Sequence, residues 1–430
     1  MIQINALVTG IMVAFGVRST LEILLNCLNT RHLRRFGNRV PHAFEGVVDE
    51  QKLTKVTAYT TDSNRIRLIH GLCGQGLTLG VLLSGFLPWL VHKISLCVAN
   101  PIGGGLIFFA SLSVVYAVPA ALFDLYATFV VEERYGFNTT SLRTWVLDLI
   151  KQTMLSAILG GLILGLLLTL IRVRHETWWI WAWMIMAAFE VIMVWLYPVV
   201  IAPWFNRFEP ISDRHLEERI RCHLEKAGLR VGGVFQMDAA KRTRHTNAFV
   251  TGLGRSKRIV LFDSLLQAHS AEEILAILCH EVGHWKRAHI IQTLILIEII
   301  TLCLLFLVAR GLDWPLLYRT FGFQEKIPFV GLFLLGVLLS VVGYLFRPIG
   351  SSVSRRFERQ ADDAAVELMG TSTFLVEALR KLSLDNLANL NPHPLFVWFY
   401  YSHPPVTGRI ARLEKRKYVR SLDETKCAAL

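Results

Sequence analysis

Two histidines and a glutamate lie at a spacing that suits metal chemistry. They belong to the segment His-Glu-Val-Gly-His, in which His280 and His284 stand four residues apart and Glu281 follows the first of them. Ser270 can cap a helix just upstream, and Glu273 can complete a capping box three residues later. On such a helix both imidazoles project from one face and can bind one Zn²⁺, while Glu281 can reach a water on the metal. The segment therefore predicts a catalytic zinc site, against the alternative of a helix with two hydrogen-bonded histidines.

A catalytic zinc site needs a third protein ligand, because the fourth position is left to water. Glu358 and Asp362, far along the chain, are four residues apart on a predicted helix and share a face. We predict Glu358 as the third ligand, since Asp362 one turn later can orient a ligating imidazole through its other N–H group. The alternative is that Glu358 only pairs with Arg355 or Arg359 on a solvated helix. The prediction is one zinc ion per chain.

The composition is that of a membrane protein. Of 430 residues, 53% are hydrophobic and 18% are charged, and the mean hydropathy is +0.44. A soluble domain is normally about a quarter charged. The seven cysteines are an odd number and include no Cys-x-x-Cys pair. Neither a disulfide framework nor a cysteine metal site is therefore expected.

Seven stretches are long and apolar enough to cross about 30 Å of hydrocarbon. Arg18 and Glu22 lie four apart in the first stretch and can pair along one helix face. Asp124 and Glu190 also fall at membrane depth, where an acidic side chain either hydrogen-bonds between helices or lines a water-filled cavity. The predicted spans lie at Ile2–Cys27, Ile69–Val91, Leu106–Val131, Met154–Ile171, Trp178–Ile201, His289–Val308 and Pro328–Phe346.

Lysine and arginine set the orientation of these spans. The short loops on one side carry eleven of them, and the loops on the other side carry six. Because cytoplasmic loops are the more basic ones, the zinc helix is expected to face the cytosol. This distribution also accounts for the formal net charge of +12 without nucleic acid.

The chain divides into four parts. Residues 1–205 hold five spans, 206–287 begin the catalytic zinc domain, 288–347 hold spans six and seven, and 348–430 complete the domain and the tail. We predict a mainly α, polytopic membrane protein of about seven transmembrane helices with a small α+β zinc metalloprotease domain.

Local patterns predict the elements of that domain. A helix is expected at Ser212–Ala227, and a β-hairpin from His245–Thr251 and Arg258–Phe262, joined through glycines. The zinc helix is expected to run almost unbroken into the sixth span, because no proline or glycine follows Gly283 there.

Further motifs accompany the zinc segment in a fixed order. With it, they resemble the type I CAAX prenyl proteases, integral-membrane zinc metallopeptidases of the gluzincin clan, and their bacterial homologues. The resemblance covers nearly all of the chain. The motifs are Glu132-Glu-Arg-Tyr-Gly-Phe-Asn138, Tyr197-Pro-Val-Val-Ile-Ala-Pro-Trp-Phe205, Thr246-Asn-Ala-Phe249, Lys257-Arg-Ile-Val-Leu-Phe-Asp-Ser-Leu265, Phe357-Glu-Arg-Gln-Ala-Asp362 and Ser402-His-Pro-Pro405.

The resemblance implies roles for further residues. His403 matches a histidine that stabilises the tetrahedral oxyanion. Asn247 matches a position that binds substrate backbone, on a strand edge that can hold an extended peptide. Arg409 matches a basic residue that binds substrate or supports the active site. In such a protease Glu281 takes a proton from the attacking water and delivers it to the leaving amine. The spans of the family enclose a large water-filled chamber.

The source and the natural substrate are less constrained. The loop at Gly311–Ile327 is shorter than in eukaryotic members, which predicts a bacterial homologue in an inner membrane, or the endoplasmic reticulum membrane if the source is eukaryotic. Bacteria do not prenylate proteins, so the substrate stays open. The chain itself carries Cys427-Ala-Ala-Leu430, which reads as a prenylation signal or as coincidence in an alanine-rich tail.

We therefore expect a membrane-embedded zinc metalloendopeptidase that cleaves membrane-associated or prenylated, CAAX-type polypeptides. Its expected partners are a peptide or protein substrate and membrane lipid, with no nucleic acid. One alternative is broad-specificity quality control of membrane proteins. A non-enzyme alternative is a transporter or channel with structural zinc, but such a site needs no Glu281 and usually closes with four protein ligands.

Overall fold

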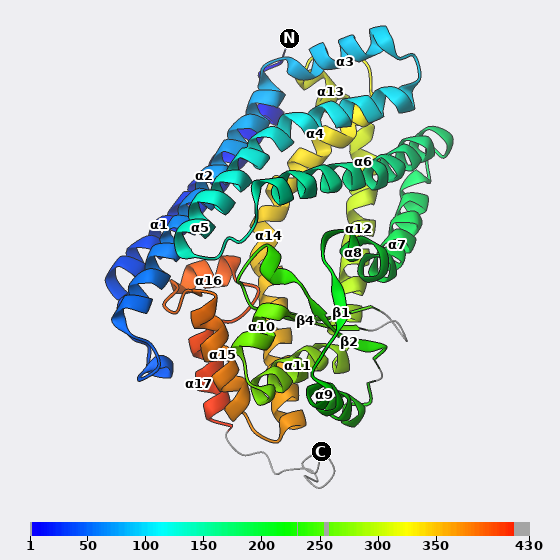
Figure 1. The fold of residues 1–430 in the computed structure, drawn as a ribbon. Coiled ribbons are helices and arrows are strands. Elements are labelled where there is room, and N and C mark those ends of the chain that lie inside the picture. Colours follow the sequence, from blue (N-terminus) through cyan, green and yellow to red (C-terminus); the bar gives the residue numbers. More distant parts are fainter. Residues whose placement is uncertain (1, 230, 253–257, 417–430) are drawn as a thin grey trace.

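Seven helices of the computed structural model are long and apolar enough to cross a membrane, among the residues that it describes (2–229, 231–252 and 258–416). This number and the mainly helical fold confirm the prediction. Figure 1 shows these helices standing above a smaller unit that holds the sheet. The spanning helices are α1 (Ala6–Phe36), α2 (Glu50–Leu83), α4 with its continuation (Pro101–Tyr135), α6 (Leu142–Val173), α7 with its continuation (Trp178–Phe205), α12 (His289–Leu312) and α14 (Pro328–Met369).

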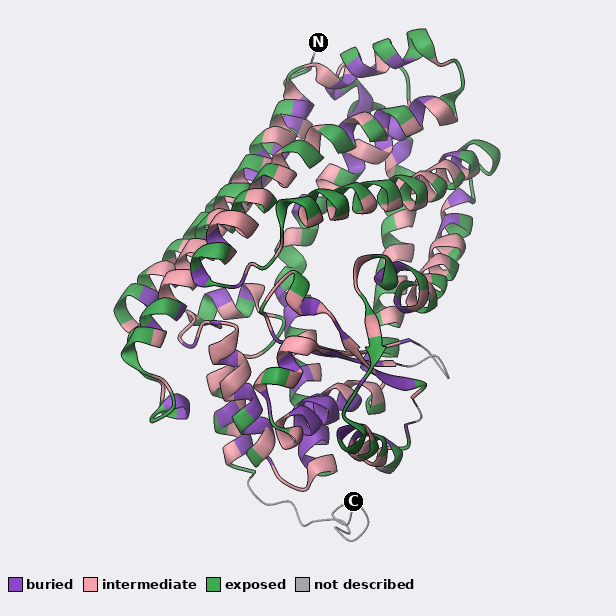
Figure 2. Cartoon of the chain, viewed as in Figure 1, coloured by how far each residue is buried: buried purple, intermediate pink, exposed green. Residues whose placement is uncertain are grey.

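The ends and outer faces of these helices follow from their residues. Asn5 caps α1 and Ser141 caps α6, each accepting backbone N–H groups of the first turn. On α6, Ile158 and Leu162 are 62% and 57% exposed, as expected of side chains that face lipid. Figure 2 shows exposed residues along this helix and buried ones gathered in the smaller unit. The short helices α3 (Phe86–Cys97) and α13 (Pro315–Thr320) lie at the end away from that unit (Figure 1).

The smaller unit contains a four-stranded sheet in the order β1-β2-β4-β3. The two strands of the expected hairpin are present and antiparallel, with Phe249 opposite Val260. Residues 253–257 of the predicted turn lie outside the described residues. Sequence patterns missed β1 and β2, of which β2 runs parallel to β4. Strand β3 forms one edge of the sheet. The strands are β1 (Phe208–Pro210), β2 (Gly233–Met237), β3 (Ala248–Thr251) and β4 (Arg258–Phe262).

Helix α11 is the buried centre of the unit. Ser270 caps it in the expected capping box with Glu273. Its apolar residues, such as Leu275 and Leu278, belong to one buried hydrophobic cluster with Ile259 and Leu261 of β4. The helices around it are α9 (Arg214–Lys226), α10 (Asp263–Ala268), α15 (Thr373–Asp385), α16 (Pro394–Tyr400) and α17 (Val406–Glu414), with α11 itself at Ala271–Lys286.

The prediction of an almost unbroken helix from the zinc segment into the sixth span is wrong. Ala288 adopts the left-handed conformation, with φ of 55°, and separates α11 from α12. Such a residue costs on the order of 1–2 kcal/mol, so other contacts must hold it. His289 supplies them: it is buried, its ring stacks on Phe357 at 4.3 Å, and Nε2 lies 2.8 Å from Gln360 Oε1. Packing against α14 therefore redirects the chain.

Gly283 allows α11 to approach α14 closely. A Cβ atom at this position would lie 2.8 Å from the carbonyl oxygen of Ala361 and 3.0 Å from the Cβ of Ala364. We expect Gly283→Ala to push the helices apart and to cost about 1–3 kcal/mol of stability. Thermal unfolding of the purified protein in detergent measures this. Gly343→Ala on α14 is the control, since its Cβ meets nothing within 4 Å; an equal Tm shift in both variants would contradict the close-approach argument.

Candidate metal centre

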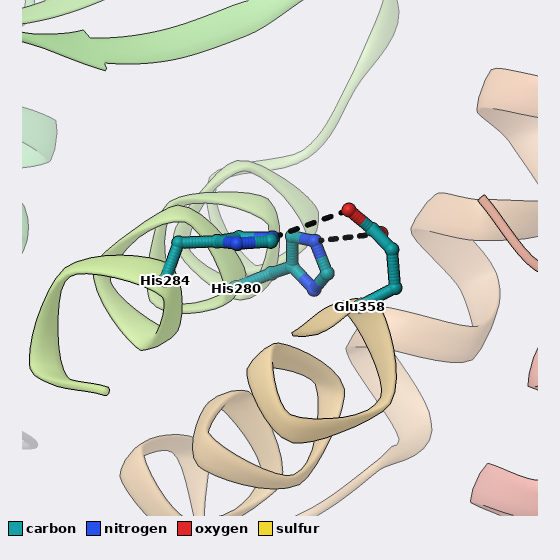
Figure 3. A group of neighbouring side chains, drawn as sticks. All are labelled: His280, His284 and Glu358. Atoms are coloured by element: carbon teal, nitrogen blue, oxygen red, sulfur yellow. Dashed lines mark ion pairs between the residues drawn. The ribbon is translucent and has the colours of Figure 1, made fainter. Parts of the chain in front are cut away.

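Two helices bring three potential metal ligands together. His280 and His284 project from α11, and Glu358 projects from α14 toward both rings (Figure 3). Their ligand atoms all lie within 4.8 Å of one another. Glu358 Oε2 is 3.4 Å from Nε2 of His280, and Oε1 is 3.3 Å from Nε2 of His284. The structure therefore brings the three predicted ligands to one point.

The alternative of a solvated Glu358 does not fit this structure. Its side chain is only 4% exposed. Arg355, one of the two surface partners in that alternative, instead donates to backbone carbonyl oxygens, the shortest bond being 2.7 Å to Tyr401. That bond ties the segment after α16 to α14, one turn before Glu358.

The chemistry of the donors suits a divalent metal. Two imidazoles and one carboxylate are the ligand set of many catalytic zinc sites. Glu358 Oε2 is buried, and although His403 Nδ1 lies 2.9 Å away, no described group gives this oxygen a bond of hydrogen-bond geometry. A cation between the carboxylate and the rings would satisfy it.

Asp362 holds His280 from behind. Its carboxylate is completely buried, and Oδ1 lies 3.0 Å from Nδ1 of His280. Arg409 donates to Asp362 Oδ2 at 3.1 Å, and Arg412 approaches the same oxygen at 3.2 Å. A proton fixed on Nδ1 leaves Nε2 as the nitrogen that faces Glu358 and the candidate metal position.

These carboxylates favour positive charge at the centre. Burial alone would lower the pKa of the His280 imidazole, but hydrogen bonds to Asp362 and Glu358 raise it to about 9. Burial would likewise lower the pKa of the Arg409 guanidinium, and the Asp362 carboxylate beside it raises that pKa instead. The same negative field attracts a metal cation.

Arg409 is largely buried beside the carboxylates of the site. Its side chain is 11% exposed, and besides Asp362 it approaches Glu358 at 3.6 Å. These contacts favour support of the site over direct substrate binding.

His403 is a solvent-exposed residue beside Glu358. It stands between α16 and α17, and its side chain is 65% exposed. Its position beside Glu358 is compatible with donation to a group bound at the metal position.

Glu281 and Asn247 are the remaining site residues that the sequence predicts. Glu281 follows His280 on α11 and forms no hydrogen bond or ion pair with another described residue. Asn247 is exposed immediately before β3, where its carbonyl accepts the N–H of Phe262 at 3.1 Å. Helix α11, which carries His280 and His284, packs against β3.

Sequence reasoning missed residues that shape the surroundings. His289 Nδ1 lies 3.1 Å from His284 Nδ1, and only its spacing of five residues from His284 hinted at it. His245 bonds Asn386 at 2.8 Å and approaches Glu132 at 3.3 Å, which fixes the entry to β3. The motif that begins at Glu132 indicated part of this network, but Asn386, which directly follows α15, is remote in sequence.

Two family models match most of the chain. The N-terminal CAAX prenyl protease model, described as five membrane helices, matches residues 29–207, and the peptidase family M48 model matches residues 210–417. A CAAX prenyl protease 1 homolog of Arabidopsis thaliana is 33% identical over 387 residues, covering 87% of this chain and 90% of that protein. The chain belongs to the CAAX prenyl protease family of M48 peptidases.

Further comparisons agree with this membership. The CAAX prenyl protease 1 of Saccharomyces cerevisiae is 33% identical over 350 residues, covering 77% of this M48 peptidase and 76% of the yeast protein. The crystal structure of S. mikatae Ste24p superposes with a TM-score of 0.88 at 28% identity, covering 94% of this chain and 98% of that one. The protein is therefore a multi-pass membrane metalloprotease, which confirms the predicted enzyme class and sets the transporter alternative aside.

Proposed function

We propose that this membrane metalloprotease is an endopeptidase that removes C-terminal residues from prenylated, CAAX-type polypeptides with one zinc ion. The convergence of His280, His284 and Glu358 within 4.8 Å is the observation that carries the metal assignment. The names of its relatives, CAAX prenyl protease 1 and its homologs, support the substrate class.

The residues around the metal position divide the chemistry among them. Bound zinc would supply a Lewis acid that polarises a carbonyl and acidifies water. Glu281 takes the proton of the attacking water and returns it to the leaving amine, a task for which its uncommitted carboxylate is suited. His403 donates to the oxyanion that develops on the scissile carbonyl. Asp362 and Arg409 keep the His280 ring in its ligating orientation.

The open edge of β3 is the proposed binding place for the substrate backbone. An extended peptide there forms main-chain hydrogen bonds with the free backbone groups of this edge strand. Asn247, directly before β3, adds a polar side chain for the same peptide. Because α11 packs against β3, a substrate peptide bound along β3 would place one of its peptide bonds near Glu281.

The zinc side of the membrane is proposed to be the cytosolic one, on the basic side of the spans. The expectation of a bacterial inner membrane stays a prediction, and the relatives named above come from eukaryotes. The Cys427-Ala-Ala-Leu430 segment lies outside the described residues.

One experiment tests the function. The purified full-length protein, reconstituted with zinc, is offered a farnesylated peptide and the same peptide without the lipid. We expect cleavage on the carboxyl side of the lipidated cysteine, with clear preference for the farnesylated form. Equal cleavage of both peptides at scattered bonds would favour broad quality control, and no cleavage of either would reject the proposal.

A further inference from the structure

A polar cavity lies among the spanning helices, apart from the metal ligands. It has a volume of about 610 Å³ and is bounded by α1, α2, α14 and α16, with Tyr116 of α4. Figure 1 shows α16 lying beside α1 and α14 at the junction with the catalytic unit. Most of the lining side chains are polar or charged, although α1 is apolar in sequence around this level.

The wall of the cavity carries excess positive charge. Arg18, Arg67 and Arg347 line it, and Glu22 is the acidic side chain among its lining residues. The expected pairing of Arg18 with Glu22 is not formed, because Glu22 Oε2 instead accepts a hydrogen bond from Gln75 at 2.8 Å. Among the described residues, none of the three arginines lies within 4.0 Å of a carboxylate. Three arginines and one glutamate give this wall a net positive charge, which suits an anionic partner.

Aromatic rings hold two of these arginines in fixed positions. The guanidinium of Arg18 lies over the ring of Tyr344 at 4.9 Å, and that of Arg347 lies over Tyr400 at 4.8 Å. The two tyrosine hydroxyls are 2.6 Å apart, so the rings form one unit. Arg18 Nε is buried and has no hydrogen-bond partner among the described residues. A guanidinium group held by stacking, with its remaining N–H donors directed at a ligand, is suited to carboxylate or phosphate oxygens.

The cavity adjoins the metal centre along the chain. Tyr401 lines it, and His403 follows two residues later. A residue spans at most about 3.6 Å, so the Cα atoms of Tyr401 and His403 lie within about 7 Å. Three extended residues reach about 10 Å. A group three residues beyond a bond cleaved at the metal centre is therefore on the right scale to enter the cavity.

We propose that this cavity is an anion subsite that binds the free C-terminal carboxylate of the substrate. The proposal rests on the proposed function and deepens it: the enzyme selects bonds at a short distance from a chain end. The required chemistry is that of a carboxylate or phosphate oxygen. The position beside His403 favours the substrate carboxylate over a lipid phosphate as its source.

Equilibrium binding tests the subsite without depending on turnover. The zinc-loaded Glu281→Gln protein is placed in neutral-lipid nanodiscs and titrated with a fluorescent farnesylated peptide ending in a carboxylate or in a carboxamide. We expect the carboxamide to bind at least about tenfold more weakly, the loss of a charged hydrogen bond. Arg18→Gln and Arg347→Gln should weaken binding of the carboxylate peptide alone. Equal affinities for the two peptides would overturn the proposal.

Three controls test whether the effect depends on these particular arginines, on an anionic lipid, or on the proposed cleavage. Arg34→Gln, an exposed arginine further along α1, should leave the ratio of the two affinities unchanged, and a changed ratio there would contradict the subsite. Repeating the titration with phosphatidylglycerol tests the lipid source; arginine effects that appear only with this lipid would overturn the substrate assignment. Wild-type cleavage of both peptides at equal kcat/KM, with equal binding, would reject the subsite while the proposed function stands. Preferential binding of the carboxylate peptide, with no cleavage of either peptide by the wild-type protein, would reject the proposed function.

Discussion

Glu281→Gln is expected to abolish peptide cleavage while leaving the fold and the bound metal in place. Glutamine keeps the size of the side chain but cannot accept the proton of the attacking water, and the loss of a general base costs on the order of 10²–10⁴ in rate. Neither ligating imidazole is changed, so the metal content should equal that of the wild type. Chromatographic assay of the farnesylated peptide gives the rate, and elemental analysis of the same sample gives the metal.

A matched glutamate shows whether the loss is specific. Glu377 is exposed on α15 and forms no ion pair or hydrogen bond with the described residues of the centre, so Glu377→Gln should cleave at the wild-type rate. Wild-type turnover by Glu281→Gln would remove this residue from the mechanism.

Glu358→Gln is expected to lose the metal. The neutral amide replaces a carboxylate whose oxygens lie 3.4 Å from Nε2 of His280 and 3.3 Å from Nε2 of His284. Loss of an outer partner of a ligand costs 10–100-fold in metal affinity, so loss of the ligand itself should exceed about 100-fold. Competition with a chromophoric chelator measures the affinity.

The control for this variant lies on the same helix. Glu367 of α14 is about half exposed and approaches Arg287 at 3.6 Å, so Glu367→Gln should keep wild-type affinity. His284→Ala should lose the metal as Glu358→Gln does. Full zinc retention by Glu358→Gln would show that another acid is the third ligand.

The spacing of residues along helices was sufficient to predict the three potential metal ligands. The spacing of His280 and His284 follows from helix geometry, and the same spacing between Glu358 and Asp362 led to the choice of the third ligand. His403 and Arg409 came from family resemblance alone, because nothing in their local sequence places them beside Glu358.

Features that depend on tertiary contacts were beyond local patterns. The break at Ala288 arises because His289 packs on Phe357, and alanine itself gives no signal of a left-handed residue. Strand β2 pairs with β4, so its short run of residues was not recognised as part of a sheet. Spacing allowed Arg18 to pair with Glu22, but Gln75 of another helix occupies that carboxylate.

Zinc K-edge X-ray absorption of the purified wild-type protein tests the central claim most directly. We expect one zinc per chain with only nitrogen and oxygen neighbours at about 2.0–2.2 Å, including the outer scattering of two imidazoles. A sulfur neighbour at about 2.3 Å, or a spectrum with one imidazole or none, would contradict the site built from His280, His284 and Glu358.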